Sequence, residues 1–174
     1  MRLVLAYLPP ALVAFLTAVL VPALGRQFLP GVRFEPFLPL VVWLAAREPL
    51  WASVPAAWVL GMLGDFLAGL PPGTGVFSLQ LLVIGIHFSA RWVQFRSAAS
   101  FALFIAPATA AHLYVQYLVL MIFGRQAILE WLLLCRVALW TAAWGVAVWY
   151  LIALSARLIG APRLPRQEIG GGNG

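Results

Sequence analysis

Long apolar segments set the first limit on how this chain folds. Five are long enough to cross a bilayer: Val4 to Leu24, Leu50 to Leu70, Gly75 to Val93, Ala98 to Phe123 and Ile128 to Leu154. The chain is 64% hydrophobic and 9% charged, against about 45–50% and about 25% in soluble domains. The sequence therefore predicts an all-α integral membrane protein, and its 174 residues leave no room for a separate soluble domain.

A sixth apolar segment, Phe37 to Ala46, is ambiguous. It lies between two charged, proline-containing runs, 33–36 and 47–49, and fits a short tilted span, a re-entrant piece or a surface helix. Arginines gather on the cytoplasmic side of membrane spans, so their positions restrict the topology. Counting them leaves either six spans with the N-terminus inside or five with it outside. Both place the turn Pro71 to Gly75 outside and the C-terminus inside.

Charge and tail composition fit a single membrane domain. All eleven basic residues are arginine and the net charge is +6, but no basic stripe alternates with aromatic residues as it does in nucleic-acid binders. We therefore assign the charge to topology and expect no nucleic-acid partner. The tail 161–174 holds two prolines and four glycines and no apolar run, so we expect it to be disordered in the cytosol. Residues 1–160 then form the one domain.

Catalytic and metal-binding patterns are missing from the sequence. Cys135 is the only cysteine, so no intrachain disulfide and no cysteine-based metal site can form. There is no HExxH, no GxSxG and no phosphate-binding loop with its Lys-Ser/Thr pair. A lone intramembrane aspartate also lacks the second carboxylate of an aspartyl-protease pair. We expect no enzyme activity, no metal and no cofactor.

Four polar side chains inside the spans fall at a similar depth. Counted at about 1.5 Å per residue, Asp65, Gln80, Gln116 and Arg136 all lie roughly 8–10 Å from the outer ends of their segments. Because a charge inside a membrane tends to find a partner, we expect Asp65 to pair with Arg136 and the glutamines to complete a buried polar layer. Its role is either helix packing or, with His112, a proton relay. Packing is the favoured interpretation.

Small residues follow one face of the segment that carries Asp65. Ala57, Gly61, Gly64 and Ala68 recur at helical spacing, and we call them the small-residue stripe. Such a stripe lets another helix backbone approach closely. Gly69 and Gly73 follow in the turn that ends the segment. We expect the stripe to receive the membrane span of a partner protein.

Two runs, "FEPFLPLVVWLAAREPLW" and "GMLGDFLAGLPPGTGVFSLQLLVIG", resemble the bacterial rod shape-determining protein MreD family. The shared features are a proline-flanked segment with Trp43, the connection 47–49, a glycine-rich helix with Asp65 and a small-residue turn. They cover about residues 34–93. The double proline of "LPPG" departs from the more usual single proline. Similar glycine-rich helices occur in the substrate-binding membrane subunits of vitamin uptake transporters.

The resemblance implies six transmembrane helices, at about 4–24, 34–46, 50–70, 75–93, 98–123 and 128–154, in a fold similar to those vitamin-binding subunits. It places the protein in the bacterial inner membrane with both termini cytoplasmic. Its function would be that of a non-catalytic scaffold in the cell-elongation complex. It would pair with MreC and help couple MreB filaments to the peptidoglycan synthases, a transpeptidase and a glycosyltransferase.

The positions carried over from the family are Gly61, Gly64, Asp65, Gly69 and Gly73, as helix-packing and turn residues. The alternative is a substrate-binding subunit of a vitamin or cofactor uptake transporter, with its pocket near the outer polar layer. That alternative requires a cavity of small-molecule size and an energising partner.

Overall fold

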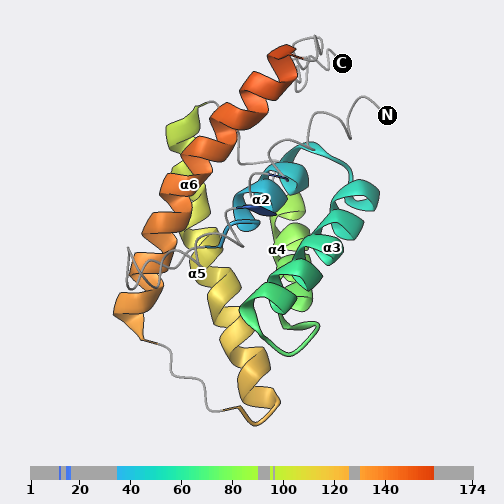
Figure 1. The fold of residues 1–174 in the computed structure, drawn as a ribbon, viewed down its shortest axis with the longest axis vertical. Coiled ribbons are helices and arrows are strands. Elements are labelled where there is room, and N and C mark those ends of the chain that lie inside the picture. The colour runs from blue at the N-terminus through green and yellow to red at the C-terminus, as the bar shows by residue number, and fades with distance from the viewer. Residues whose placement is uncertain are drawn as a thin grey trace, which may run out of the picture.

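The computed structural model describes residues 12, 15, 16, 35–89, 95, 97–125 and 130–158. Within these residues the elements are helices, with no strand: α2 (Leu38–Arg47), α3 (Leu50–Ala68), α4 (Thr74–Ser89), α5 (Ala98–Ile122) and α6 (Trp131–Leu158) (Figure 1). The all-helical expectation is thus confirmed for this part of the chain. The expected first span, apart from Leu12, Phe15 and Leu16, lies outside the described residues, and so does the tail 161–174.

Three of these helices are long and apolar enough to cross a membrane: α3, α5 and the Trp131–Ser155 part of α6. Helices α2 and α4 are apolar but shorter. A membrane protein is therefore compatible with the described structure, which supplies three candidate spans where the sequence predicts six. Helix α2 begins at Leu38, later than the start expected at residue 34.

Helix α2 is short and lies at the centre of the bundle, between α3 and α4 on one side and α5 and α6 on the other (Figure 1). At 10 residues and about 1.5 Å per residue it is about 15 Å long, half the thickness of a hydrocarbon core of about 30 Å. Every residue from Leu38 to Ala45 is buried. A helix that is apolar on all sides needs cover on all sides, so α2 lies in the core, and a second span at this place is not among the three candidate spans.

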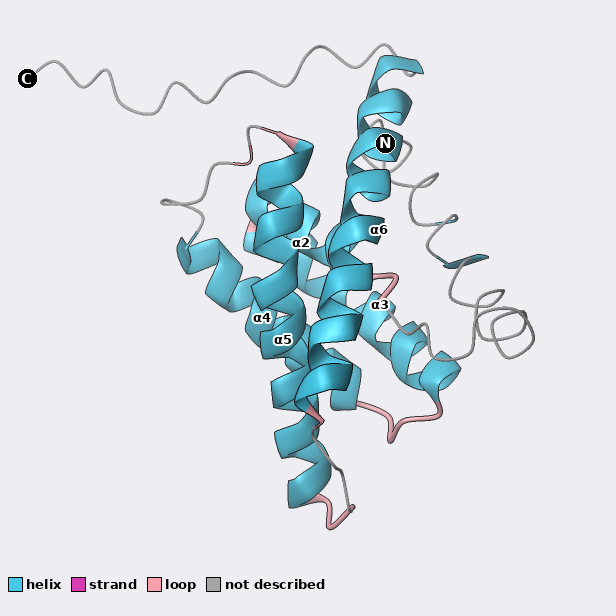
Figure 2. Cartoon of the chain, turned by 90° about the vertical axis from the view of Figure 1, so that its left-hand side faces the viewer, coloured by secondary structure: helices cyan, strands magenta, loops and turns pink. Residues whose placement is uncertain are grey.

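The four longer helices form two hairpins, α3 with α4 and α5 with α6. Their turns lie at the same end of the bundle (Figure 2). Helix α3 ends at Gly69, which has φ 65°, and Gly73 in the same turn has φ 98°. Only glycine adopts such left-handed angles at little cost. These two glycines therefore fix where α3 stops and how the chain reverses into α4.

Aromatic side chains surround the C-terminal end of α2. The Trp43 ring packs edge-on against Phe101 and Trp149, with centroids 6.0 and 5.1 Å apart. The guanidinium of Arg47 lies 4.4 Å from the centre of the Trp43 ring. Edge-to-face and cation–π contacts of this kind stabilise a buried aromatic cluster beyond its area alone. They join α2 to α5 and α6.

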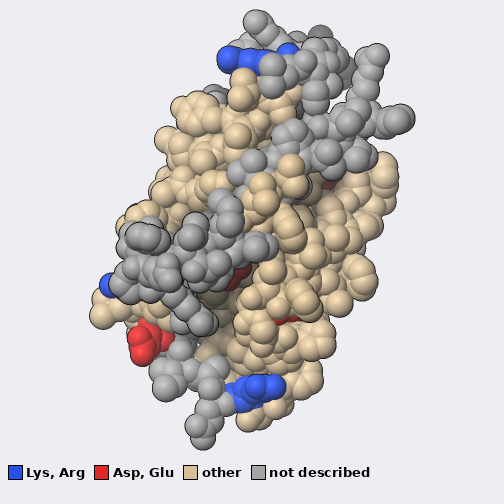
Figure 3. Space-filling model, in the orientation of Figure 1, with Lys and Arg blue, Asp and Glu red and all other residues tan. Residues whose placement is uncertain are grey.

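The outer surface is widely apolar. Large apolar side chains stand outward on every described helix except α2, among them Trp51 (80% exposed), Phe66 (85%) and Leu132 (86%). Figure 3 shows an uncharged surface over most of one face, with the larger arginine patches near the two ends of the molecule. In water this much exposed apolar surface would drive association. Lipid covers it without cost, so the surface favours a membrane setting.

Gly61 offers a test of how closely α3 and α4 pack. A Cβ atom at Gly61 would lie 2.6 Å from Cα and 2.8 Å from N of Val76, both backbone atoms of α4. We expect Gly61→Ala to lower stability by about 1–3 kcal/mol, because the two helices have to move apart. The measurement is thermal unfolding in a mild detergent.

Gly85 provides the matched control, since a Cβ there meets nothing within 4 Å. Gly85→Ala should leave stability unchanged or raise it by up to about 1 kcal/mol, through the better helix propensity of alanine. Equal melting temperatures for the two variants would contradict the close contact between α3 and α4.

Candidate functional site

Asp65 links the end of α3 to the start of α4. Its Oδ1 accepts a hydrogen bond from the Gly75 backbone N–H at 2.6 Å, and its Oδ2 accepts one from the Gly73 N–H at 2.9 Å. The side chain is only 2% exposed. The first amides of a helix have no partner within the helix and form its positive end. A buried carboxylate at this place pairs two of these donors and is itself stabilised by the helix.

Glycines make this contact possible, because they carry no side chain. A Cβ atom at Gly75 would lie 2.6 Å from Asp65 Oδ1 and 3.2 Å from the Gly61 carbonyl oxygen. The backbone of the turn also returns to Asp65, because the Leu70 N–H donates to the Asp65 carbonyl at 2.9 Å. Asp65 therefore holds the α3–α4 turn through both its side chain and its backbone.

The expected pair between Asp65 and Arg136 does not form in this structure. The Asp65 carboxylate bonds to amides only 8 and 10 residues away, while Arg136 is exposed on α6. Gln80 is half-buried on α4. The depth estimate treated Asp65 as a charge needing an opposite charge, whereas the adjacent helix start already supplies donors and a positive dipole. Asp65 and Arg136, two members of the predicted polar layer, therefore do not meet.

The small-residue stripe packs inside the chain. Ala57 and Gly61 are buried, with Gly61 against the α4 backbone, and the nearest atom to a Cβ at Gly64 is Cδ2 of Phe37 at 4.0 Å. Ala68 and Gly69 are exposed at the end of α3, and Gly73 is half-buried. The stripe is therefore occupied within the chain at Ala57 and Gly61, whereas Gly64 is half-buried and Ala68 exposed. Binding of a partner on the stripe stays a prediction.

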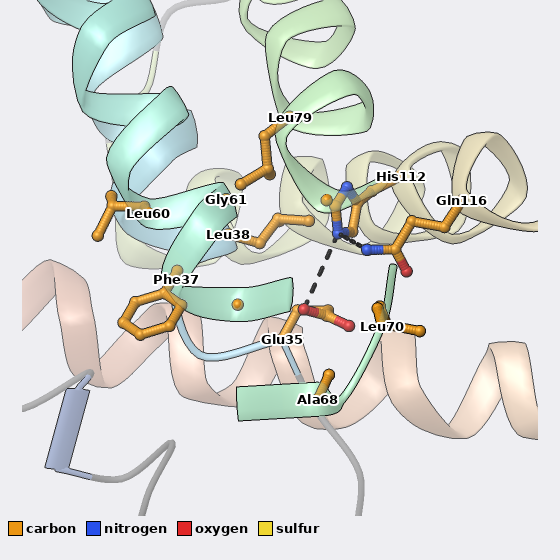
Figure 4. A pocket seen from close by; sticks show the side chains of 12 residues that line it. Glu35, Phe37, Leu38, Leu60, Gly61, Ala68, Leu70, Leu79, His112 and Gln116 are labelled. Carbon is orange, nitrogen blue, oxygen red and sulfur yellow. Dashed lines mark hydrogen bonds and ion pairs between the residues drawn. The ribbon is translucent and has the colours of Figure 1, made fainter. Parts of the chain in front are cut away.

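A second polar cluster lies beside the α3–α4 turn and consists of Glu35, His112 and Gln116 (Figure 4). Gln116 Nε2 lies 3.0 Å from His112 Nε2, and Glu35 Oε2 lies 3.9 Å from the same ring nitrogen. His112 is 2% exposed, and its Nδ1 has no hydrogen-bond partner. The sequence puts Gln116 in the predicted polar layer and names His112 as part of a possible relay, but Glu35 stands there only in the charged run 33–36. An acidic residue directly before Pro36 and the start of an apolar run was the available signal.

Helix α6 fixes the position of Glu35. The Glu35 backbone N–H donates to Thr141 Oγ1 at 3.0 Å, and Trp144 Nε1–H donates to the Pro36 carbonyl at 3.0 Å. These residues are 106 and 108 positions apart in the sequence. Backbone groups just before a buried helix would otherwise stay unpaired in an apolar setting. The two bonds thus hold the acidic segment inside the bundle.

The cluster borders a small cavity, to which Gly61 and Gly64 of α3, Gly75 and Leu79 of α4, and Leu38 of α2 also contribute. Its volume is about 30 Å³. A water molecule needs about 10–15 Å³ by this kind of measure, whereas small-molecule sites occupy about 300–1,000 Å³. The space therefore fits one or two water molecules and is smaller than such a site. Within the described residues, no three His, Cys, Asp or Glu side chains gather where a metal ion could bind.

Comparison with known proteins adds no relative. No protein-family model matches this chain, and neither a curated protein nor a solved structure is significantly similar to it. The likeness to the MreD family therefore depends on the sequence features quoted above. Function has to be argued from the geometry of the bundle.

Replacement of Asp65 tests the α3–α4 link. We expect Asp65→Ala to destabilise the protein by about 1.5–3 kcal/mol, because two amide donors lose a charged acceptor. Asp65→Asn should cost less, since one oxygen remains to accept a hydrogen bond. Thermal unfolding in detergent gives the order of the variants, and Glu130→Gln, at an exposed position before α6, is the control. Wild-type stability in Asp65→Ala would show that the two hydrogen bonds are dispensable.

Proposed function

We propose that this protein is a non-catalytic membrane scaffold of the bacterial cell-elongation complex. In this role it sits in the inner membrane, pairs with MreC and helps couple MreB filaments to the peptidoglycan synthases. The proposal joins the MreD-like sequence features to the way the bundle uses its polar residues. It concerns binding between proteins, with no chemical step.

The size of the interior cavity is the observation that carries this proposal. The cavity of about 30 Å³ lies where a substrate-binding subunit would need a pocket about ten times larger. The polar groups around it bond to the protein itself: Asp65 to the α4 amides, and Gln116 to His112. An interior of this kind maintains architecture, which argues against the vitamin-transport alternative.

The outward faces of the helices support a role in binding other membrane proteins. On α3 the exposed residues Trp51, Trp58, Met62 and Phe66 recur at helical spacing. Since part of the small-residue stripe is occupied within the chain, an outward face of this kind also offers a partner span a place to pack. Between helices in a membrane, close packing and a few polar contacts provide the affinity.

Purification from the native membrane tests the proposal. We expect a tagged full-length chain, extracted in mild detergent, to retain MreC and the wall synthases, without a small molecule in stoichiometric amount. Protein and small-molecule mass spectrometry on the same eluate measure both. Recovery of ATPase subunits or a bound vitamin would instead support a transporter subunit and overturn the scaffold.

Photo-crosslinking identifies the face that a partner uses. A photoreactive residue is placed at one outward position on each of four helices: Val59 on α3, Leu81 on α4, Leu103 on α5 and Leu139 on α6, all exposed. We expect the crosslink to MreC to be strong at one or two adjacent helices and weak at the others. A position inside the stripe, Ala57, is buried and is the negative control. Equal crosslinking at all positions would indicate random contact.

A further inference from the structure

The Glu35–His112 cluster has a feature that packing does not require. Both groups can gain or lose a proton, and they meet next to a cavity inside an apolar bundle. His112 lies ten residues from the end of α5 at Ile122, or about 15 Å along the helix. This is about half the thickness of a hydrocarbon core. Ionisable groups at such depth are costly and tend to be functional.

The adjoining cavity leaves room for water beside the two groups. Glu35 Oε2 and His112 Nε2 are 3.9 Å apart, too far for a direct hydrogen bond. The adjoining cavity of about 30 Å³ accommodates one or two water molecules. His112 also has an unpaired Nδ1 while only 2% exposed, and buried polar atoms of this kind commonly bind water. A water in the cavity beside the pair can bond to both groups.

The Glu35 and His112 side chains differ in their exposure to solvent. The Glu35 side chain is 32% exposed and that of His112 is 2% exposed. Glu35 therefore stands at the open side of the cluster and His112 at its closed side. A proton that reaches Glu35 has the water-sized cavity beside His112 as a path inward.

Among the described residues, few other charges face the pair. From α3 Asp65 is near, and its carboxylate keeps its negative charge while it accepts from the Gly73 and Gly75 amides. Helix α4 carries no Asp, Glu, Lys or Arg, and the one charge of α2, Arg47, packs on Trp43 at the opposite end. Helix α6 presents the neutral Thr141 and Trp144, while its Arg136 is exposed. Among the described residues, Glu35 and His112 are thus the only titratable pair here within 4 Å.

Charge balance then decides how many protons the pair holds. With one proton shared between them, the pair is neutral overall, either as a carboxylic acid beside a neutral imidazole or as a carboxylate beside an imidazolium. With none, the pair adds a second negative charge beside that of Asp65. With two, the pair itself is positive. Two like charges close together are costly in an apolar interior, so the pair holds at least one proton.

We propose that Glu35 and His112 form a buried proton-binding site that holds one exchangeable proton across a water molecule in the cavity. In the transfer, the O–H bond of protonated Glu35 breaks as its proton passes to the water. The water in turn gives one of its own protons to Nε2 of His112, forming an N–H bond. Because the Gln116 NH2 group occupies the Nε2 lone pair at 3.0 Å, its amide first turns away, and its oxygen then accepts from the new N–H. This site is independent of the scaffold role.

Spectroscopy of the full-length protein in lipid nanodiscs tests the site directly. Infrared difference spectra report protonated carboxyl groups, and nitrogen NMR of labelled histidine reports the ring. The chain has two histidines, so in the His87→Gln variant the only histidine signal is that of His112. We expect a carboxyl band and the His112 signal to change together over one pH range, since coupled groups titrate as a pair.

Variants show which residues cause these pH-dependent changes in the spectra. Glu35→Gln should remove the carboxyl band and the coupled change at His112, whereas the exposed control Glu130→Gln should leave both in place. His112→Gln should move the midpoint of the band by about one pH unit or more, the size expected for a partner within about 4–6 Å. Gel filtration checks that each variant folds, and the wild-type spectra provide a test that needs no substitution at Glu35 or His112.

Three outcomes would overturn the site. The first is a carboxyl band that Glu35→Gln does not remove, or no such band at any pH. The second is a His112 signal that titrates identically with and without Glu35. The third is a spectrum that responds at constant pH to replacing sodium by choline, which would assign the cavity to a metal cation. Loss of MreC binding in the purification experiment has no bearing on these results.

Discussion

The need to pair backbone amides and carbonyls where helices break off inside an apolar bundle shapes the whole structure. Among the described residues, the α3–α4 turn and the segment just before α2 show how such groups are paired. At the first, the Asp65 carboxylate accepts from Gly73 and Gly75. At the second, Thr141 and Trp144 of α6 bond to the backbone of Glu35 and Pro36. The hydrogen bonds at each break join elements that would otherwise separate, and the joined segments surround the cavity.

These bonds depend on close backbone approach. Gly61 and Gly75 bring α3 and α4 together, since a Cβ atom at either would lie 2.6 Å from an atom across the contact. Gly145 of α6 has a similar role beside Ile105 of α5. These glycines are therefore consumed in building the monomer. A partner protein can also recognise the outer faces, where the exposed aromatic and aliphatic side chains stand.

The two proposals concern different parts of the bundle. The scaffold role depends on the outer surface and on the small size of the cavity beside His112. The proton site depends on a cluster of the described residues in which His112 Nδ1 has no hydrogen-bond partner. Asp65, the most conspicuous charge in the sequence, belongs to neither, because its bonds are local and structural. The functional interest shifts to Glu35, which the short helix α2 brings to mid-depth.

The sequence by itself determined the helical, membrane-compatible class, since apolar segments of such length and so few charges allow little else. It also located α3, α5 and α6 closely, and the glycines of the α3–α4 turn, because these are properties of local composition. Six spans, the family and the partners remain expectations. The tertiary structure decided which groups meet. Depth counting gives a position along the membrane normal but no direction around a helix, so it matched Asp65 with Arg136 across the bundle. Only the fold shows that Arg136 faces outward, that α2 is a buried core helix, and that Glu35 reaches His112 from 77 positions away.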